Sequence, residues 1–469
     1  MSILTLGKVI SSVSVSGAGD AKSTPEVTEM EKEQELHYRL EDRPSPTETV
    51  LLALQWALFM YSINLIYPLV IGDIFQFPPA ETTALVQRST FLVGLGSLLQ
   101  VMWGHRVPIT EGVAAVWFSI FILSYQAGVP AGQSPGAVLQ SMEFGLIFAG
   151  VLMILLSLGG VLNAIQRLFT PLVIGMALIL IALQVSGTFV QGMVGYENGQ
   201  VRGLVALCSI LVVALVTFLS YRGNAYLKNF SALIGLLVGW GLYSLLGLGG
   251  TQAAGTVPDR LIYLPQLLAW GAPRVSAAVA VTALICCLVL VANHLASYAA
   301  ARSVLGQELP AGTIKKGGVC NGISNLLSGL LAGIGTVPIA NAAGFVEMTG
   351  VGARLPFLLA AVILMLVGLI WPLGQFFTSI PAPVVYAVSF VAFTRMVGIG
   401  FTNLLRVRLN QRNLIIIGLT LCISVGLMFV PPAAYAGLPV VFQLVCGNGL
   451  LMGIVLVLLL EHLVFRAGR

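Results

Sequence analysis

Two short stretches of the sequence resemble each other, Val107-Pro108-Ile109-Thr110-Glu111 and Val337-Pro338-Ile339-Ala340-Asn341. Both begin Val-Pro-Ile, and both place a polar side chain two residues after the Ile. A glycine follows in each case, at Gly112 and Gly344. Proline and glycine interrupt helices, because proline lacks an N–H to donate and glycine has low helix propensity. The two stretches therefore predict a matched pair of short, broken segments.

Composition indicates that these segments belong to a polytopic membrane protein. Of the 469 residues, 57% are hydrophobic and 9% are charged, whereas about 25% of a typical soluble domain is charged. Residues 1–48 hold 9 of the 18 Asp and Glu and 5 of the 23 Lys and Arg. The few charges left cannot cover a water-facing surface, which excludes a soluble enzyme. A net charge of +5 without a basic stripe excludes a nucleic-acid binder.

Apolar runs of about 20 residues are long enough to cross a bilayer as helices. Fourteen segments are predicted, at residues 48–72, 84–103, 108–126, 138–160, 168–190, 203–220, 228–248, 272–299, 317–334, 338–350, 354–373, 379–398, 411–431 and 438–463. The broken stretches open the third and the tenth segment. Backbone at membrane depth is irregular only where protein or a water-filled cavity satisfies it, so we expect both broken segments in the protein interior.

The distribution of Lys and Arg orients these segments. With the N-terminus in the cytoplasm, 19 of the 23 Lys and Arg fall on the cytoplasmic side, and only Arg88, Arg202, Arg260 and Arg274 fall outside. Because cytoplasmic loops carry the excess of Lys and Arg, we predict an even number of spans with both termini in the cytoplasm. Residues 1–47, rich in Ser, Thr and Glu, predict a disordered cytoplasmic tail.

The spacing of the broken segments predicts an internal symmetry. The third and tenth segments are seven apart, and because seven is odd, the second half enters the membrane in the opposite orientation. Inverted repeats of this kind build secondary transporters, whose substrate sites lie near the bilayer midplane between discontinuous segments. The predicted fold class is an all-α polytopic membrane protein with 14 transmembrane segments arranged as 7+7 inverted repeats.

Several residues match one known family. Gly344 and Thr349 fit its tenth-segment signature, and Leu54-Gln55 and Pro68 fit its first segment. Over residues 45–465 the sequence resembles the nucleobase–ascorbate transporters, also called the nucleobase:cation symporter-2 or xanthine/uracil permease family, and within it a divergent branch of bacterial purine permeases. The resemblance implies a multi-pass protein of the bacterial inner (plasma) membrane, similar in fold to sulfate and bicarbonate transporters.

The resemblance also implies how the segments are grouped. A core domain would comprise residues 48–160 (segments 1–4) and 251–373 (segments 8–11). A gate domain would comprise residues 161–250 (segments 5–7) and 374–469 (segments 12–14 and the C-terminus). Short strands in segments 3 and 10 would cross near the midplane, and gate domains would pair in a homodimer.

The sequence departs from the family at two carboxylates. Asn293 stands where the eighth segment carries Glu in the family, and Asn341 stands where the tenth carries Glu or Gln. A carboxamide offers a donor and an acceptor, which suits the edge of a nucleobase. We predict that both amides bind this edge, helped by backbone N–H groups near Ala340 and Ala342 and by Ser297. The alternative is that the amides bond interrupted backbone and hold helices together.

Stacking on the base requires an aromatic face. The Phe that the family carries on its third-segment strand falls on Ala115 here. Alternate residues of a strand share a face, so Trp117 is the nearest aromatic residue on that side. Phe345 follows the glycine of the other broken segment. Alternatively, both rings pack in the core or against lipid.

Ionisable residues inside a membrane are functional candidates, and Glu111 is the first candidate for coupling transport to H+ or Na+. As the repeat-mate of Asn341 it is expected to face the same cavity. The alternative is that Glu111 lies near an interface and pairs with Arg106 or His105.

Glu347 and His294 are the other two candidates for proton coupling. Glu347 lies six residues beyond Asn341 and is expected closer to the cytoplasm, near Arg354, as an ion pair or a gate. His294 follows Asn293 directly, so it points about 100° away on a helix. It serves either as a proton relay or in a hydrogen bond within the core.

The preferred function is secondary active transport of nucleobases by alternating access, with proton symport. Purines such as xanthine, uric acid, guanine, hypoxanthine or adenine are the expected substrates, with uracil as a further candidate. A small-anion or metabolite carrier on the same fold and a non-transporting substrate sensor are the alternatives. The sequence contains no Walker motif, metal-ligand spacing or nucleophile–base pattern, so we predict no enzymatic activity, cofactor or metal site.

Overall fold

The computed structural model of the protein describes residues 36–130, 132–196, 199–248, 261–306, 312–430, 434 and 449–465. Within these residues, eight helices are long and apolar enough to cross a membrane. They lie at Pro46–Ile74, Pro79–Met102, Pro135–Leu158, Pro171–Met193, Gly203–Arg222, Ala277–Arg302, Ala382–Leu405 and Gln411–Met428. Residues 1–35 of the predicted tail and residues 438–448 of the fourteenth predicted segment lie outside the described residues.

In each half of the chain, one short strand interrupts a series of helices at a similar place. The first half contains α1 (Pro46–Asn64), α2 (Ile66–Ile74), α3 (Pro79–Met102), β1 (Glu111–Val113), α4 (Ala115–Gly128), α5 (Pro135–Leu158), α6 (Leu162–Gln166), α7 (Pro171–Met193), α8 (Gly203–Arg222) and α9 (Ala225–Leu245). The second half contains α10 (Ala277–Leu305), α11 (Thr313–Leu330), β2 (Thr336–Pro338), α12 (Asn341–Thr349), α13 (Arg354–Val367), α14 (Trp371–Thr378), α15 (Ala382–Leu405), α16 (Gln411–Met428), α18 (Gly449–Leu459) and the π-helical turn Leu460–Val464.

Side-chain caps start many of these helices. A hydroxyl or amide oxygen at the N-cap accepts a hydrogen bond from the backbone N–H three residues ahead, which satisfies a donor that the helix itself leaves free. The residues that do so are Ser45, Ser134, Thr170, Asn224, Ser276 and Asn410. The helix α12 lacks such a cap, since its N-cap residue is Ala340.

The first span is broken between α1 and α2. Pro68 has no N–H to donate to the carbonyl of Asn64 four residues earlier. The Asn64 side chain lies at the break: its Nδ2 donates to Met60 O at 2.7 Å, and its Oδ1 accepts from Val113 N at 2.7 Å. The break therefore places an amide that holds one end of β1.

The two broken segments meet as an antiparallel sheet. Glu111 pairs with Pro338 and Val113 pairs with Thr336, so β1 ends where β2 begins. The helices α4 and α12 therefore start at opposite ends of the sheet. A Cβ at Gly112 would lie 2.0 Å from Ile339 Cδ1, so a larger residue there would require the Ile339 side chain to move. The short strands implied by the resemblance are present, although β2 begins two residues before the predicted tenth segment. The described elements are otherwise helical, so the predicted all-α class holds apart from these two three-residue strands.

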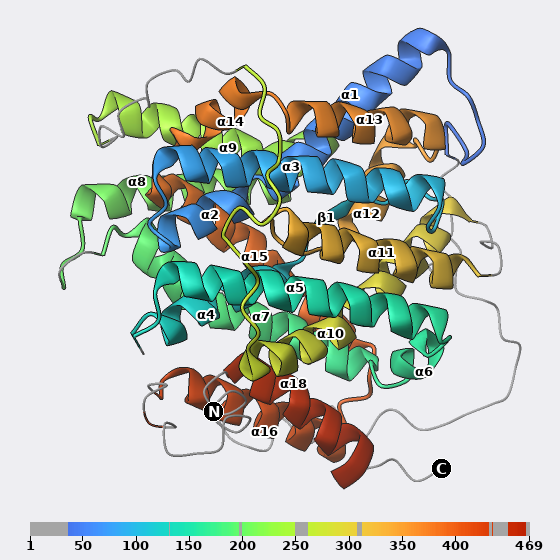
Figure 1. The fold of residues 1–469 in the computed structure, drawn as a ribbon, viewed down its shortest axis with the longest axis vertical. Coiled ribbons are helices and arrows are strands. Elements are labelled where there is room, and N and C mark those ends of the chain that lie inside the picture. Colours follow the sequence, from blue (N-terminus) through green and yellow to red (C-terminus); the bar gives the residue numbers. More distant parts are fainter. Residues whose placement is uncertain are drawn as a thin grey trace, which may run out of the picture. The chain divides into compact units, whose positions relative to one another are not determined.

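Two groups of helices surround and flank the sheet. In the first group α5 packs along α11, α3 along α13, and α10 against α5. Figure 1 shows α3, α11 and α5 lying side by side. In the second group α7 packs along α15 and contacts α16 and α18. Backbones approach closely in the first group, since a Cβ on Gly150 of α5 would lie 2.5 Å from Leu326 N of α11.

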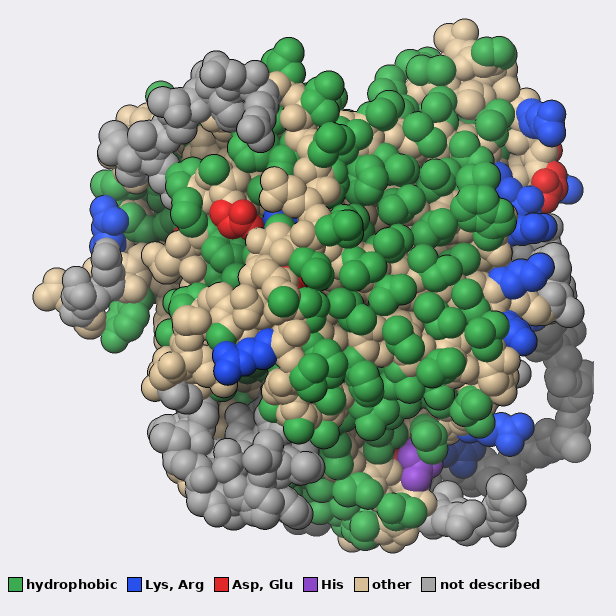
Figure 2. Space-filling view, in the orientation of Figure 1, with side chains coloured by type: hydrophobic (Ala, Val, Ile, Leu, Met, Phe, Trp, Pro, Cys, Tyr) green, Lys and Arg blue, Asp and Glu red, His purple; other side chains and the backbone are tan. Residues whose placement is uncertain are grey.

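The surface is apolar over a wide area. Figure 2 shows hydrophobic side chains across the middle of the visible face, with most of the visible Lys and Arg along one edge. Leu155 and Phe218, for example, are 60% and 62% exposed. Soluble monomers rarely expose apolar patches beyond a few hundred Å², so this surface fits a lipid environment with a basic margin.

Residues 36–45 are held in place, contrary to the predicted disordered tail. Tyr38 forms a parallel bridge with Val351, and Leu40 is only 5% exposed. Glu41 forms an ion pair with Arg354 at 2.9 Å. The prediction of disorder is therefore wrong for this stretch, which adds a short extended segment to the connection between α12 and α13.

Candidate functional site

Glu111 lies fully buried at the start of β1, where amide side chains surround it. Gln100 Nε2 of α3 donates to Glu111 Oε1, and Asn321 Nδ2 of α11 lies 3.2 and 3.1 Å from the two carboxylate oxygens. The predicted alternative of a pairing with Arg106 or His105 is wrong. Glu111 thus has amide donors as partners within the described part of the chain, and no Lys or Arg there pairs with it.

Two asparagines one turn apart on α11 clamp the sheet. Asn321 Nδ2 and Asn325 Nδ2 donate to Thr336 O at 3.0 and 2.8 Å. Neither Asn was predicted from the sequence to have a role, and neither was Gln100. The signal was present: amides spaced four residues apart in an apolar segment share one face of a helix, and buried amides require partners.

Trp117 is fully buried and bonded within the core. Its Nε1 donates to Asn325 Oδ1 at 3.0 Å, and its ring lies against Gly335. The premise behind its predicted role is wrong, because α4 begins at Ala115 and the strand has already ended at Val113. Two residues on a helix are about 200° apart, so Ala115, which is half-buried, and Trp117 do not share a face.

Phe345 also packs in the core. Its ring stacks on Phe59 with centroids 4.2 Å apart and meets Trp56 edge-on at 4.5 Å. Phe357 of α13 contacts the same Trp56. The ring is 1% exposed, so the structure agrees with the packing alternative and joins α12 to α1.

Asn293 on α10 and Asn341 at the start of α12 are the free amides of the site. Asn341 is exposed and Asn293 is half-buried, and neither side chain has a hydrogen-bond partner among the residues that the structure describes. The two helices pack against each other. Ala340 and Glu347 are exposed with Asn341, whereas Ala342 is buried and its N–H already donates to Ile339 O. The predicted help from the Ala342 N–H is therefore wrong.

Glu111 and Asn341 do not face a common cavity. The Glu111 carboxylate has no exposed surface and points to α3 and α11, whereas Asn341 lies on the exposed face of α12. The expectation that the repeat-mates share one space is wrong. The strands pair, yet their flanking side chains point to different neighbours.

Ser297 and His294 form hydrogen bonds within the protein, whereas Glu347 lacks its predicted ion pair. Ser297 Oγ donates to Pro338 O at 2.6 Å and so fastens β2 to α10. His294 is buried, with Nε2 3.2 Å from Ile314 O, which is the core hydrogen bond that was one of its two predicted roles. Glu347 does not pair with Arg354, as the ion pair of Arg354 in the described chain is with Glu41.

A contact between the two helix groups closes one side of the molecule. Tyr386 Oη of α15 donates to Asp73 Oδ2 of α2 at 2.7 Å, and Gln126 Nε2 of α4 donates to Thr188 Oγ1 of α7 at 3.0 Å. Aromatic rings pack beside these bonds, with Phe118 of α4 5.6 Å from Phe393 of α15. No contact between α12 and α7 or α15 matches this one in extent.

Arg88 is a buried cation that is already neutralised. It is 1% exposed, and its Nη2 lies 2.6 Å from Glu81 Oε1. Its guanidinium lies over the ring of Trp270 at 5.5 Å, and Trp270 N donates to Glu143 Oε1 at 3.3 Å. The charge is therefore paired with Glu81, while Arg88 Nε has no hydrogen-bond partner in the described chain.

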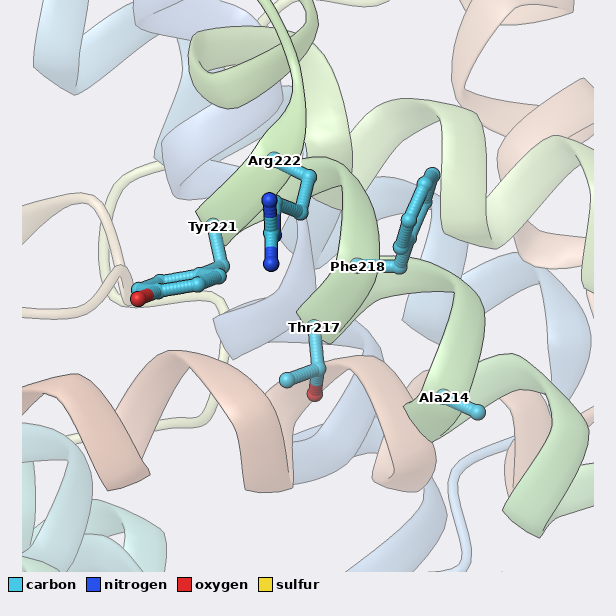
Figure 3. Close-up of a pocket in the computed structure, with 5 residues that line it drawn as sticks. All are labelled: Ala214, Thr217, Phe218, Tyr221 and Arg222. Atoms are coloured by element: carbon cyan, nitrogen blue, oxygen red, sulfur yellow. The ribbon is translucent and has the colours of Figure 1, made fainter.

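A surface hollow lies apart from these residues. Its lining comes from α8 alone, and Figure 3 shows these side chains projecting from that helix: Ala214, Thr217, Phe218, Tyr221 and Arg222. Because one helix supplies every lining group, the hollow has no opposing wall to hold a flat ring.

Two broken segments that pair inside a bundle of membrane-spanning helices, with helices starting at both ends of the pair, define a membrane transporter rather than an enzyme. The sequence pattern of the xanthine/uracil permeases, described as "Permease family", matches residues 47–433. The chain belongs to this family.

Named relatives are similar over most of the chain. The protein "Putative purine permease YwdJ" of Bacillus subtilis is 31% identical over 412 residues, covering 86% of this chain and 93% of the relative. The uric acid permease PucK of the same organism is 23% identical, with coverage of 88% and 95%. Among solved structures, the transmembrane domain of the cyanobacterial bicarbonate transporter BicA has a TM-score of 0.59 at 18% identity, covering 86% of this chain and 97% of that domain. The last similarity concerns the fold alone.

Proposed function

We propose that the protein is a secondary transporter of purine bases, and that Asn293 and Asn341 bind the edge of the base. One observation carries this: two amides on packed helices, α10 and α12, are half-buried and exposed, respectively, and neither has a partner in the described chain. An unpaired amide beside a helix start offers complementary donors and acceptors to a purine edge. The names of YwdJ and PucK favour a purine as the substrate class.

The architecture we propose is fourteen segments in two inverted repeats of seven. The core domain holds the sheet with α1–α5 and α10–α13, and the gate domain holds α6–α9, α14–α16 and α18. The pairing of β1 with β2 supports the repeat, and the two helix groups support the division. Both termini lie on the cytoplasmic side of a bacterial plasma membrane. Two copies of the chain pair through their gate domains.

Uneven contacts between the two helix groups support a mechanism of alternating access. The bonds from Asp73 to Tyr386 and from Gln126 to Thr188 close what is, in this orientation, the outer side. The exposed faces of Asn341 and Glu347 on α12 belong to the inner side. The conformation is thus open toward the cytoplasm, and the outward state requires these bonds to break.

Glu111 is the proposed proton-coupling group. It is the buried carboxylate next to the sheet, and its amide partners Gln100 and Asn321 can donate to the ionised form without adding a charge. Because the purine amides lie elsewhere, coupling runs through movement of the sheet rather than through direct contact with substrate.

An anion carrier is less well supported. A core Arg or Lys would favour an anion, but the buried Arg88 is paired with Glu81. Uptake of labelled xanthine, uric acid and hypoxanthine into proteoliposomes tests the proposal, with uracil and bicarbonate as competitors. We expect saturable uptake that unlabelled purines compete for and bicarbonate does not. Competition by bicarbonate alone would favour the anion carrier, and binding without uptake would favour a sensor.

A further inference from the structure

Arg354, the first residue of α13, joins three parts of the chain that are far apart in sequence. Its Nε donates to Arg106 O at 2.5 Å, in the loop that leads into β1. Its Nη2 forms the ion pair with Glu41 at 2.9 Å, and its backbone N donates to Leu40 O at 3.1 Å. One arginine thus connects the entry to β1 and the exit from α12 with the segment before α1.

Arg106 has a backbone conformation that this bond stabilises. Its φ is +58°, in the left-handed region that residues with a Cβ seldom adopt. The guanidinium of Arg354 binds the carbonyl of this strained residue, and a hydrogen bond from a charged donor is stronger than one between neutral groups. Arg354 therefore holds the turn from which the chain enters β1.

The connection from α12 to α13 is held at the same place. Tyr38 N donates to Gly350 O at 3.0 Å, and Gly352 N donates to Tyr38 O at 2.8 Å. A Cβ on Gly352 would lie 2.9 Å from Leu305 Cδ2, so the connection lies directly against the last residue of α10. The C-terminal end of α12 is therefore attached both to the end of α10 and to the segment before α1.

Packing along α10 and α12 does not by itself fix their spacing. An apolar gap lies between the two helices and the loop before β1, and its lining includes Pro108, Val304 and Ala343. Side chains that border a gap lose attractive contacts on that side. Leu305 lines the same gap, which therefore lies next to the connection that Arg354 holds. The contacts around Arg354 consequently set the spacing of the two helices.

We propose that Arg354 is a positioning residue for the purine site, which rests on the proposed role of Asn293 and Asn341. Asn341 begins α12, and this helix of nine residues is about 13 Å long and ends at the connection held by Arg354. A change of tilt at that end moves Asn341 relative to Asn293 on α10. Arg354 touches no substrate in this scheme and keeps the two amides at the separation that a purine edge requires.

The test measures KM and kcat for uptake of labelled xanthine and uric acid into proteoliposomes that contain equal amounts of purified protein. Arg354→Gln removes the charged donor to Arg106 O. We expect it to raise the purine KM about tenfold while kcat stays near the wild-type value. If Arg354→Gln gives too little folded protein, Arg354→Lys replaces it with the same expectation, because lysine keeps the positive charge but lacks the guanidinium N–H groups.

Two controls separate this bond from charge in general. Glu41→Gln removes the exposed ion pair and keeps the bond from Arg354 to Arg106 O, so its KM should stay near the wild-type value. Arg408→Gln is the matched control, at an exposed arginine between α15 and α16, and its KM should also be unchanged.

Combination with Asn341→Ala shows whether Arg354 acts through this amide. If it does, Arg354→Gln should raise KM less in the Asn341→Ala background than in the wild type. An unchanged KM in Arg354→Gln, a fall in kcat alone, or an equal rise of KM in both backgrounds would overturn the positioning role, while purine binding by the amides would stand. If Asn293→Ala and Asn341→Ala themselves leave KM at the wild-type value, the proposed site fails and this inference fails with it.

Discussion

Tyr386 Oη donates a hydrogen bond to Asp73 Oδ2 at 2.7 Å, and this bond joins α15 of one helix group to α2 of the other. A carboxylate acceptor makes such a bond stronger than one between neutral groups. In the proposed alternating-access cycle the two groups separate on this side when the transporter opens outward, so we expect the bond to stabilise the inward-open state.

Removing the Tyr386 hydroxyl should therefore favour the outward-open state. Tyr386→Phe keeps the ring against Phe189 and deletes the donor to Asp73. A hydrogen bond to a charged group is worth about 1.5–3 kcal/mol, so the inward-to-outward equilibrium should shift by at least about tenfold. The measurement is labelling of a single cysteine placed at the exposed Ala340, by an impermeant thiol reagent from each side of oriented vesicles.

Tyr61→Phe is the matched control, because the Tyr61 hydroxyl is buried without a partner in the described chain. We expect Tyr386→Phe to lower cytoplasmic labelling and Tyr61→Phe to leave it unchanged. Equal labelling of both variants and the wild type would contradict a latch between Asp73 and Tyr386.

The amide clamp on α11 should matter for stability. Asn325→Leu has similar volume but removes the acceptor of Trp117 Nε1 and one donor to Thr336 O. Leaving a buried donor unsatisfied costs about 1–3 kcal/mol, so thermal unfolding in detergent should occur at a lower temperature. Ser328→Ala is the control on the same face, since Ser328 Oγ bonds only the carbonyl of Ser324 in its own helix.

A double-variant cycle isolates the bond between Asn325 and Trp117. Trp117→Phe removes the other partner, and the combined variant should lose less stability than the sum of the two single variants. Strict additivity would mean that the two side chains do not interact in the membrane-embedded protein.

The segment before α1 is held by a buried leucine and by an ion pair, and single substitutions can compare what each contributes to stability. Leu40 is 5% exposed, so Leu40→Ala should cost about 2–5 kcal/mol through lost contacts and an internal cavity. The Glu41–Arg354 ion pair is solvent-exposed, with the Glu41 side chain 75% exposed. Glu41→Gln should therefore cost no more than about 1 kcal/mol. Thermal unfolding of the two variants checks this order, and a larger loss in Glu41→Gln would show that charge anchors the segment.

The existence of two matched broken segments was predictable, because Val-Pro-Ile recurs in both halves and proline limits the backbone that can follow. That their strands meet was implied only by the family resemblance. The burial of Glu111 among amides was not predicted, because the sequence suggested a cavity-facing or an interfacial carboxylate. Its partners were not predictable either, since Gln100 and Asn321 lie on different helices and no local pattern links them to Glu111.

Other predictions were wrong because the end of a strand or of the ordered chain was misplaced. The role predicted for Trp117 assumed a strand through Ala115, but the strand is three residues long and the helix follows at once. A shift of this size moves a side chain to another face of its element. Residues 36–45 were predicted to be disordered because their polar composition gave no sign that Leu40 is buried against the folded chain.

The purine site is tested by the purine KM of uptake in Asn293→Ala, Asn341→Ala and the double variant. Both amides are without partners in the described chain, so their loss should leave folding intact. Each single variant should raise the KM about 2- to 10-fold, the effect of one neutral hydrogen bond, and the double variant should raise it further. An unchanged KM in the double variant, with transport intact, would contradict the claim that these two amides bind the purine.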